Sequence, residues 1–303
     1  MAIKSANAPP KIIGIVGPTA SGKTGIALGL AREFNGEIIS CDSVQIFKHL
    51  DIGSAKPSQS ETGKIKYHLI DLIEPDCRID AGMYKSLAES KILEVLASGQ
   101  TPIVAGGTGM YFNSLYYGLF SGPGRSDKIR DDLASRQEDS LYEELVQRDP
   151  ESAGKIKSGD TRRIVRALEV YYSTGRPISE LHRENKKLEL NWFIIGLICD
   201  RQTLYGRIEK RVDFMIGEGL LKETEDIISK FGKEAYALSS IGYRHASNYL
   251  SGVWTYEEFV FFLKRDTRRY AKRQMTWFKK NGDIHWFDIL DAEGIKGAVR
   301  GFL

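Results

Sequence analysis

The chain has 303 residues, of which 42% are hydrophobic and 27% charged, and its formal net charge at pH 7 is only +3. This length predicts one large or two modest domains with a real hydrophobic core. Because the charges nearly balance, the protein as a whole is not a polycation, and any surface that binds nucleic acid must be a local patch. The three cysteines, Cys41, Cys77 and Cys199, are far apart and match neither a zinc site nor a disulfide framework, which suits a reducing compartment.

Membrane insertion and secretion are not expected. No stretch of the sequence approaches the roughly 20 apolar residues that a membrane-spanning helix needs. The first ten residues contain one lysine and no apolar segment, so they do not resemble a secretory signal. We therefore expect a cytoplasmic protein with no membrane partner.

The most informative motif is a glycine-rich stretch near the N-terminus. An apolar run at 12–16 predicts a buried strand, and apolar residues at helical spacing follow at 24–32. A strand, the pattern G-x-x-x-x-G-K-[ST] and a helix, in that order, predict a P-loop. Its amides and the helix N-terminus would surround a di- or triphosphate, Lys23 adds a positive charge, and the Thr24 hydroxyl is a ligand for Mg²⁺. The alternative is a turn without a ligand. The motif consists of Gly17, Pro18, Thr19, Ala20, Ser21, Gly22, Lys23 and Thr24.

Two further turns are expected at the same edge of the sheet. A predicted strand at 36–40 leads into Cys41-Asp42-Ser43-Val44-Gln45, and one at 101–105 leads into Gly106-Gly107-Thr108-Gly109. Ligands of open parallel sheets bind at the carboxyl ends of the strands, so Asp42 is a candidate base or Mg²⁺ ligand. The alternatives are that Asp42 only caps a short helix after it and that the glycines only make a tight turn.

The alternation of strands and helices predicts an α/β fold, a P-loop NTPase-like doubly wound parallel sheet. A helix is expected at 81–96 and further strands at 67–72 and 192–198. From Phe120 the composition changes: Ser121-Gly122-Pro123-Gly124 resembles a linker, and helices are predicted at 129–136, 141–148 and 161–172. We therefore predict a P-loop core in two parts, 1–119 and 190–303, an inserted helical subdomain at 120–189, and basic helices at the C-terminal end of the core.

Arginines on a helix expected at 204–215 are candidates for reaching the phosphates. Arg207 and Arg211 are four residues apart and so lie on one face, whereas Ile208, Val212 and Met215 mark a buried face.

Two other helices carry clusters of basic residues. Arg162, Arg163 and Arg166 lie on neighbouring turns of one helix. The C-terminal cluster is opposed only by Asp266, is interleaved with aromatic residues, and contains Lys264, Arg265, Arg268, Arg269, Lys272, Arg273, Lys279 and Lys280. Basic and aromatic side chains together suit a nucleic-acid backbone and unpaired bases, although a solvated helix face explains each cluster equally simply.

Six separated motifs resemble, in type and order, the tRNA dimethylallyltransferase family, also called tRNA isopentenyltransferases. The resemblance covers nearly the whole chain. The chain resembles the short bacterial form of the family, which has no zinc finger. The motifs are the P-loop, Asp42-Ser43-x-Gln45, Asp51-Ile52-Gly53-x-Ala55-Lys56-Pro57, Gly106-Gly107-Thr108-Gly109-x-Tyr111, Arg166-Ala167-Leu168-Glu169-Val170 and Ala271-Lys272-Arg273-Gln274-x-Thr276-Trp277-Phe278.

The resemblance implies an activity. A dimethylallyl group would pass from dimethylallyl diphosphate to N6 of the adenosine 3′ of the anticodon (adenosine 37) in tRNA, giving N6-isopentenyladenosine and diphosphate. The P-loop would hold the diphosphate rather than ATP, with Mg²⁺ as cofactor. Thr19 would bond the oxygen between the prenyl carbon and phosphorus, Arg211 would stabilise the leaving group, and Asp42 would be the general base.

The resemblance also implies a partner, the tRNA anticodon stem-loop, bound by a monomer. Departures from the family pattern include Phe47, where a tyrosine is common, and His245, to which we assign no role. The alternatives are a small-molecule kinase and a non-catalytic RNA-binding nucleotide switch. The implied tRNA contacts are Asp42, Ser43, Val44, Gln45, Thr108, Arg130, Arg162, Arg163, Arg166, Lys272, Arg273, Trp277 and Lys279.

Overall fold

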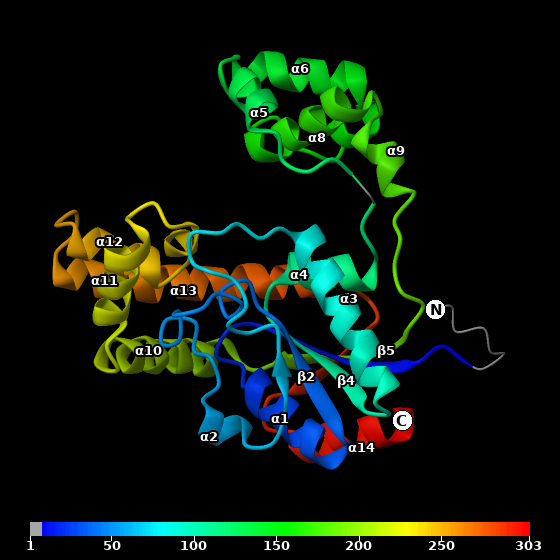
Figure 1. Ribbon diagram of the computed structural model, residues 1–303, viewed down its shortest axis with the longest axis vertical. Coiled ribbons are helices and arrows are strands. Elements are labelled where there is room, and N and C mark those ends of the chain that lie inside the picture. The colour runs from blue at the N-terminus through cyan, green and yellow to red at the C-terminus, as the bar shows by residue number, and fades with distance from the viewer. Residues whose placement is uncertain (1–7, 121) are drawn as a thin grey trace. The chain divides into compact units, whose positions relative to one another are not determined.

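The computed structural model describes residues 8–120 and 122–303 (Figure 1). Most of the N-terminal segment, 1–7, and the first residue of the predicted linker, Ser121, lie outside the described residues. The chain divides into two compact units, the first formed by Met1–Asn113 with Glu189–Leu303 and the second by Ser114–Leu188. The second unit thus begins at Ser114 rather than at the predicted residue 120, and ends at Leu188 rather than at residue 189.

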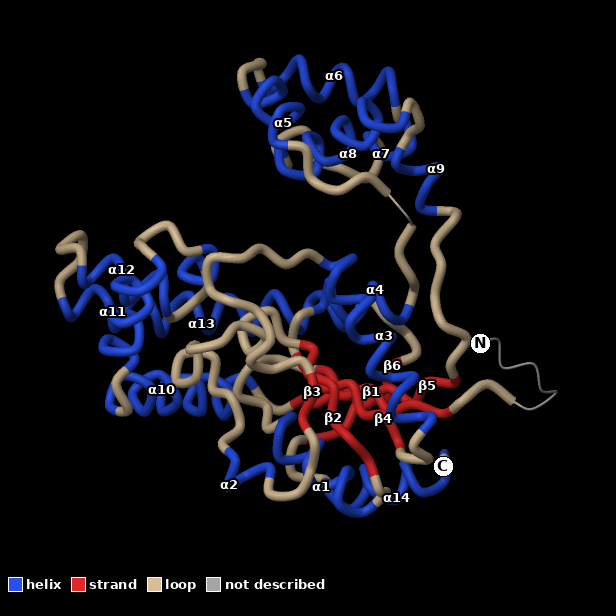
Figure 2. Tube along the Cα trace, viewed as in Figure 1, coloured by secondary structure: helices blue, strands red, loops and turns tan. Residues whose placement is uncertain are grey.

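The first unit is built on a parallel sheet, which Figure 2 shows at its centre. The sheet has six strands in the order β3-β2-β4-β1-β5-β6. Each neighbouring pair is parallel, which confirms the predicted doubly wound α/β fold. The strands are β1 (Lys11–Val16), β2 (Gly36–Cys41), β3 (Tyr67–His68), β4 (Thr101–Gly106), β5 (Asn191–Ile198) and β6 (Ile284–Asp288), the last of which was not predicted.

Helices cover both faces of this sheet. On one face, α1 (Lys23–Glu33) and α14 (Ala292–Phe302) bury apolar side chains against β1, β2, β4 and β5. On the other face lie α3 (Ala81–Ala97), α4 (Gly109–Tyr116) and α13 (Tyr256–Phe278) (Figure 2). Phe112 of α4 makes edge-to-face ring contacts there with Trp192 at 5.6 Å and Phe278 at 6.1 Å between ring centroids. Such close packing on both faces explains why the strands are almost continuously apolar.

The remaining helices of the first unit are α2 (Gln59–Thr62), α10 (Arg201–Gly217), α11 (Leu220–Phe231) and α12 (Tyr243–Leu250), with a 3-10 turn at Tyr236–Ser239. Helices α10 to α13 pack in succession, with α10 against both α11 and α13. As predicted, Ile208, Val212 and Met215 form the buried face of α10. Within the described ranges, no helix combines the length and the apolar character that crossing a membrane requires.

The prediction of a strand at 67–72 is wrong beyond its first two residues. Leu69 (φ 61°) and Asp71 (φ 51°) adopt the left-handed conformation, which ends the extended chain after His68. The His68 imidazole lies 2.6 Å from the Glu37 carboxylate of β2, a hydrogen-bonding contact between the two neighbouring strands.

The second unit is helical, as predicted. It contains α5 (Asp127–Ala134), α6 (Glu138–Arg148), α7 (Pro150–Ala153), α8 (Thr161–Thr174) and α9 (Ile178–His182), of which the short α7 and α9 were not predicted. These helices enclose a separate core that includes Leu133, Leu145 and Leu168.

A buried carboxylate organises two of the arginines in this unit. Glu169 is fully buried, and its oxygens accept hydrogen bonds from Nε and Nη2 of Arg130, both at 2.9 Å, and from Nη1 of Arg166 at 2.7 Å. Burial by itself raises the pKa of the Glu169 carboxyl, but the hydrogen bonds from Arg130 and Arg166 outweigh it and bring the pKa to about 2. Both guanidinium groups are therefore already bound to a protein carboxylate, whereas Arg162 and Arg163 are exposed.

We predict that Glu169 makes the second unit sensitive to acid. A carboxyl with a lowered folded pKa stabilises the fold fully above its ordinary pKa of about 4.5, and this stability is lost as the pH falls towards 2. Between pH 5 and pH 3, the free energy of unfolding of this unit should fall by about 2 kcal/mol more in the wild type than in Glu169→Gln. Hydrogen exchange of peptides from 114–188 measures the difference, and equal losses in both proteins would contradict it.

Candidate active site

The carboxyl ends of β1, β2 and β4 open into a cavity of about 440 Å³ in the first unit. This edge of a parallel sheet is where ligands are expected to bind. The walls come from the P-loop, from the turns after β2 and β4, and from α10 and α13. The lining residues are Thr19, Ala20, Gly22, Lys23, Thr24, Asp42, Gln45, Ala55, Tyr67, Ala105, Gly106, Gly107, Arg207, Lys210, Arg211, Tyr270 and Gln274.

The P-loop has the backbone of an anion-binding turn. Ala20 (φ 63°) and Gly22 (φ 84°) are left-handed, and Gly22 caps α1 without any side-chain hydrogen bond. The first amides of α1 are therefore available to a ligand. Five of the eight predicted residues, Thr19 to Thr24 without Ser21, line the cavity.

The other three P-loop residues lie behind this surface. The carbonyl oxygen of Pro18 accepts a hydrogen bond of 2.7 Å from Lys23 Nζ. The Ser21 hydroxyl is buried and has no partner among the described residues. A Cβ on Gly17 would lie 3.0 Å from the carbonyl oxygen of Leu197, so the loop packs closely on β5.

Positive charge dominates the cavity. Its lining contains four cationic side chains, Lys23, Arg207, Lys210 and Arg211, and one carboxylate, Asp42. Burial and then the neighbouring Arg211 lower the pKa of Lys23 to about 8, against the opposing effect of Asp42. Burial also lowers the pKa of Arg211. Both shifts have the sign expected for crowded, desolvated cations, and a bound polyanion would relieve them.

Asp42 closes a tight turn after β2. Its Oδ1 accepts hydrogen bonds from the amides of Val44 at 2.9 Å and Gln45 at 3.3 Å. The residues that follow form turns rather than a helix, so the alternative role of Asp42 as a helix cap is not realised. Since the Asp42 side chain also lines the cavity, the turn holds a carboxylate at the wall in a fixed orientation.

The turn after β2 is bound to the glycine turn after β4. Thr108 Oγ1 accepts from the Ser43 amide at 3.0 Å, and the Thr108 amide donates to the carbonyl oxygen of Cys41 at 3.1 Å. A Cβ on Gly106 would lie 2.0 Å from that same oxygen, so only glycine permits this approach.

Gln274 of α13 connects the P-loop to the glycine turn. Its Oε1 accepts from the Thr19 amide at 2.8 Å, and its Nε2 donates to the carbonyl oxygen of Gly107 at 2.8 Å. One turn earlier on α13, burial and then the charge of Asp42 raise the pKa of Tyr270 to about 12, so its hydroxyl stays protonated.

The C-terminal basic cluster is more strongly neutralised than predicted. Lys264 pairs with Asp213 at 2.6 Å and Arg268 with Glu209 at 2.6 Å. The prediction that only Asp266 opposes these charges is therefore wrong, because α10 lies against α13 and supplies two more carboxylates. Lys272, Arg273, Lys279 and Lys280 are exposed, and none has an ion-pair partner within the described residues. Trp277 packs against Gly109, and its indole N–H is buried without a hydrogen-bond partner among the described residues.

Four polar side chains of the lining were given no site role from the sequence: Tyr67, Lys210, Tyr270 and Gln274. Tyr270 and Gln274 are four residues apart on α13, and Lys210 lies between the two arginines that were singled out. The spacing of residues along one helix face was therefore the signal that could have indicated Lys210, Tyr270 and Gln274. Tyr67 lies on β3, which pairs with β2 at the edge of the sheet.

We predict that diphosphate binding protonates Lys23. With a pKa of about 8, roughly half of the Lys23 side chains are neutral at pH 8, and a bound anion favours the charged form. Wild type should take up about half a proton more than Lys23→Arg when it binds inorganic pyrophosphate. Calorimetry in two buffers of different ionisation enthalpy measures the uptake, and equal values would contradict the assignment.

The sequence and the fold both match known proteins. A family model described as IPP transferase matches residues 45–281. The tRNA dimethylallyltransferase of Acetivibrio thermocellus is 44% identical over 285 residues, covering 91% of each chain, and that of Anoxybacillus flavithermus is 42% identical over 283 residues, covering 93% of this chain and 91% of the other.

Solved structures agree. The tRNA isopentenylpyrophosphate transferase of Bacillus halodurans is 36% identical, with a TM-score of 0.73 and 96% of each chain covered. A eukaryotic dimethylallyltransferase described as acting on tRNA is 28% identical, with a TM-score of 0.80, and the match covers 97% of this chain and 78% of that one. The extent of these matches shows that this chain belongs to the IPP transferase family, the family of the tRNA dimethylallyltransferases.

Proposed function

We propose that this protein transfers a dimethylallyl group from dimethylallyl diphosphate to N6 of adenosine 37 in tRNA, giving N6-isopentenyladenosine and diphosphate. One observation carries the proposal: a single cavity is lined by the P-loop, by four cations from the P-loop and α10, and by one carboxylate, Asp42. The reaction needs both features, since a diphosphate leaves while an amine loses a proton. Family membership does not favour the kinase or the nucleotide switch.

The cationic end of the cavity suits the departure of diphosphate. Negative charge grows on the leaving group as the bond between carbon and oxygen breaks, and donors fixed in advance stabilise it. Lys23, Arg207 and Arg211 supply charge, and the first amides of α1 supply dipoles. Arg207 Nη1 lies 4.0 Å from the position of a Cβ on Gly22, so its guanidinium faces the P-loop. Thr19 lines the same wall and is proposed to bond the bridging oxygen.

Asp42 is proposed to be the general base. The amino group of adenine is a poor nucleophile because its lone pair is delocalised, so it must lose a proton as it attacks the prenyl carbon. Two backbone amides hold Oδ1 of Asp42, which leaves Oδ2 to accept the proton. The adenine has to leave the anticodon stack to reach this position.

Mg²⁺ is the cofactor that the site is proposed to use. The lining offers a hydroxyl, Thr24, and a carboxylate, Asp42, and the described residues contain no group of three or more side chains that would form a metal cage. This sparse donor set fits Mg²⁺, which commonly takes one or two protein ligands and completes its shell with phosphate and water. When bound by Thr24, the ion would neutralise charge on the diphosphate.

Two sets of exposed cations are proposed to hold the tRNA. Lys272, Arg273 and Lys279 at the end of α13 have no ion-pair partner within the described residues, and Arg162 is exposed on the second unit. A cytoplasmic location is part of the proposal, because tRNA is the proposed substrate. We also propose that the protein acts as a monomer.

Product analysis tests the proposed function directly. The protein is incubated with dimethylallyl diphosphate, Mg²⁺ and total tRNA, and the nucleosides are then analysed by mass. Prenylated adenosine is expected. Phosphoryl transfer from ATP without any prenylated nucleoside would instead identify a kinase.

Replacement of Asp42 should separate chemistry from binding. Loss of a general base typically costs about 10²- to 10⁴-fold in rate, so Asp42→Ala should lower turnover by that factor while tRNA affinity changes much less. Single-turnover prenylation and filter binding measure the two effects. Turnover close to that of the wild type would rule out Asp42 as the base.

Salt dependence should reveal which lysines and arginines contact tRNA. Each phosphate contact contributes roughly −0.7 to −0.9 to the slope of log affinity against log salt. Removing Lys272 and Arg273 together should flatten that slope by about one to two units and weaken all substrate tRNAs alike. Lys264→Ala is the control, since its charge is already paired with Asp213. If the double variant keeps the wild-type slope, the tRNA must be held elsewhere.

A further inference from the structure

The loop 51–56 forms part of the cavity wall and carries none of the residues assigned above. Ala55 lines the cavity, and the carbonyl oxygen of Ser54 accepts hydrogen bonds from Arg211 Nη2 at 3.5 Å and from Gln45 Nε2 at 3.4 Å. The same amide of Gln45 reaches the carbonyl oxygen of Ala55 at 3.3 Å. The loop thus helps to position two side chains that line the cavity, those of Gln45 and Arg211.

The backbone conformation of this loop is energetically unfavourable at one residue. Ala55 has a left-handed backbone, with φ 47°, which costs a residue other than glycine about 1 kcal/mol or more. Such a conformation persists only where surrounding groups fix it. Two charged side chains provide that support, Lys56 within the loop and Glu223 from α11.

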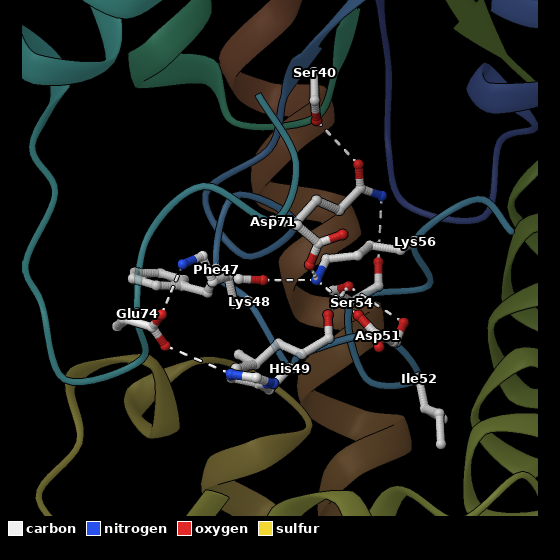
Figure 3. A network of polar contacts seen from close by, with 12 residues as sticks. Ser40, Phe47, Lys48, His49, Asp51, Ile52, Ser54, Lys56, Asp71 and Glu74 are labelled. Atoms are coloured by element: carbon white, nitrogen blue, oxygen red, sulfur yellow. Dashed lines mark hydrogen bonds and ion pairs between the residues drawn. The ribbon is translucent and has the colours of Figure 1, made fainter. Parts of the chain in front are cut away.

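Lys56 ties the end of the loop to the chain on either side. Its side chain is almost fully buried, and Nζ donates to the carbonyl oxygen of Phe47 at 2.6 Å, to Asp51 Oδ1 at 2.7 Å and to Asp71 Oδ1 at 2.5 Å. Figure 3 shows this network, with Lys56 reaching between Asp51 and Asp71.

Glu223 holds the start of the loop from outside. Its Oε2 accepts hydrogen bonds from the amides of Asp51 and Ile52, both at 2.9 Å, and its Oε1 accepts from the amide of Gly53 at 3.1 Å. Three successive amides thus converge on one carboxylate, as they do in backbone sites that bind anions. These three hydrogen bonds account for the position of the Glu223 carboxylate without a cation beside it.

Tyr243 of α12 fixes Glu223 in turn. Its hydroxyl donates to Glu223 Oε1 at 2.5 Å, and its ring is fully buried against the loop. A Cβ on Gly53 would lie 2.5 Å from this ring, so the loop and the tyrosine are in direct contact. Burial and then the Glu223 charge raise the pKa of Tyr243 far above its ordinary value, so the hydroxyl remains a donor.

We propose that Glu223 is a positioning residue for the diphosphate site, acting through the loop 51–56 on Arg211. The carboxylate fixes three amides, the loop then presents the carbonyl oxygen of Ser54, and this oxygen orients the guanidinium. Glu223 itself touches no ligand. The inference rests on the proposed function only in taking diphosphate as the ligand of the cavity.

A double-mutant cycle tests the coupling, with inorganic pyrophosphate and Mg²⁺ as the probe. Calorimetry measures pyrophosphate affinity for wild type, Glu223→Ala, Arg211→Ala and the double variant, each well below its own melting temperature. The control is Glu225→Ala on the same helix, because that exposed carboxylate pairs with Lys222, at 3.3 Å, and with no other described residue. Tyr243→Phe removes one hydrogen bond to Glu223 and keeps the ring, so it replaces Glu223→Ala should that variant not fold.

The expected result is a loss of coupling. Glu223→Ala should weaken pyrophosphate binding by about five- to tenfold in the wild-type background and less than twofold when Arg211 is already alanine, because contacting residues are not additive. A purely structural role would lower the melting temperature without this background dependence. Equal fold-changes in both backgrounds would overturn the proposal.

Failure of the inference and failure of the proposed function can be told apart. If wild type prenylates tRNA but the two substitutions act independently, only the positioning role is wrong. If wild type neither binds pyrophosphate nor prenylates tRNA, the proposed function and the positioning role are both wrong.

Discussion

Gln274 holds two of the loops that line the cavity, the P-loop and the glycine turn after β4, at a fixed separation. Its amide oxygen holds the Thr19 backbone at the end of β1, and its amide nitrogen holds the Gly107 carbonyl beyond the end of β4, which is the neighbouring strand. The side chain is buried, so removing it would leave one donor and one acceptor unpaired at a cost of about 1–3 kcal/mol each. α13 therefore stabilises the shape of the P-loop through Gln274. The same helix carries Lys272 and Arg273, so the element that shapes the cavity also presents exposed cations.

The charge of the cavity explains why its walls must be so firmly held. Four cations share the lining with one carboxylate, and burial adds to their mutual repulsion. Without support, these side chains would turn towards water. Hydrogen bonds from Lys23 to Pro18 and from Arg211 to Ser54 keep two of them facing inward, and the backbones that accept these bonds are themselves fixed, by Gln274 near the first and by Glu223 near the second.

Local patterns predicted the central part of the fold and most of the site. The P-loop, the strands that end at Asp42 and Gly106, and the arginines of α10 all follow from motifs or periodicities within one short segment. What the sequence did not reveal depends on contacts between distant segments. Gln274 and Thr19 are 255 residues apart in the sequence, and Glu223 is up to 172 residues from the amides of 51–53 that it binds.

Charge pairing was also hidden from the sequence. The carboxylates that neutralise Lys264 and Arg268 lie on α10, and no spacing within α13 could indicate them. Likewise, the apolar run at 67–72 favours a strand, but left-handed residues at Leu69 and Asp71 end it early. Tertiary contacts decide such cases, and local propensity does not.

We propose that one cavity releases diphosphate as it transfers a prenyl group to adenosine. The stoichiometry of a single turnover tests this, with pyrophosphate and prenylated tRNA quantified in the same reaction. We expect one pyrophosphate for each prenylated adenosine, with no need for ATP. Pyrophosphate or phosphate released without prenylated tRNA, or prenylation that requires ATP hydrolysis, would contradict it.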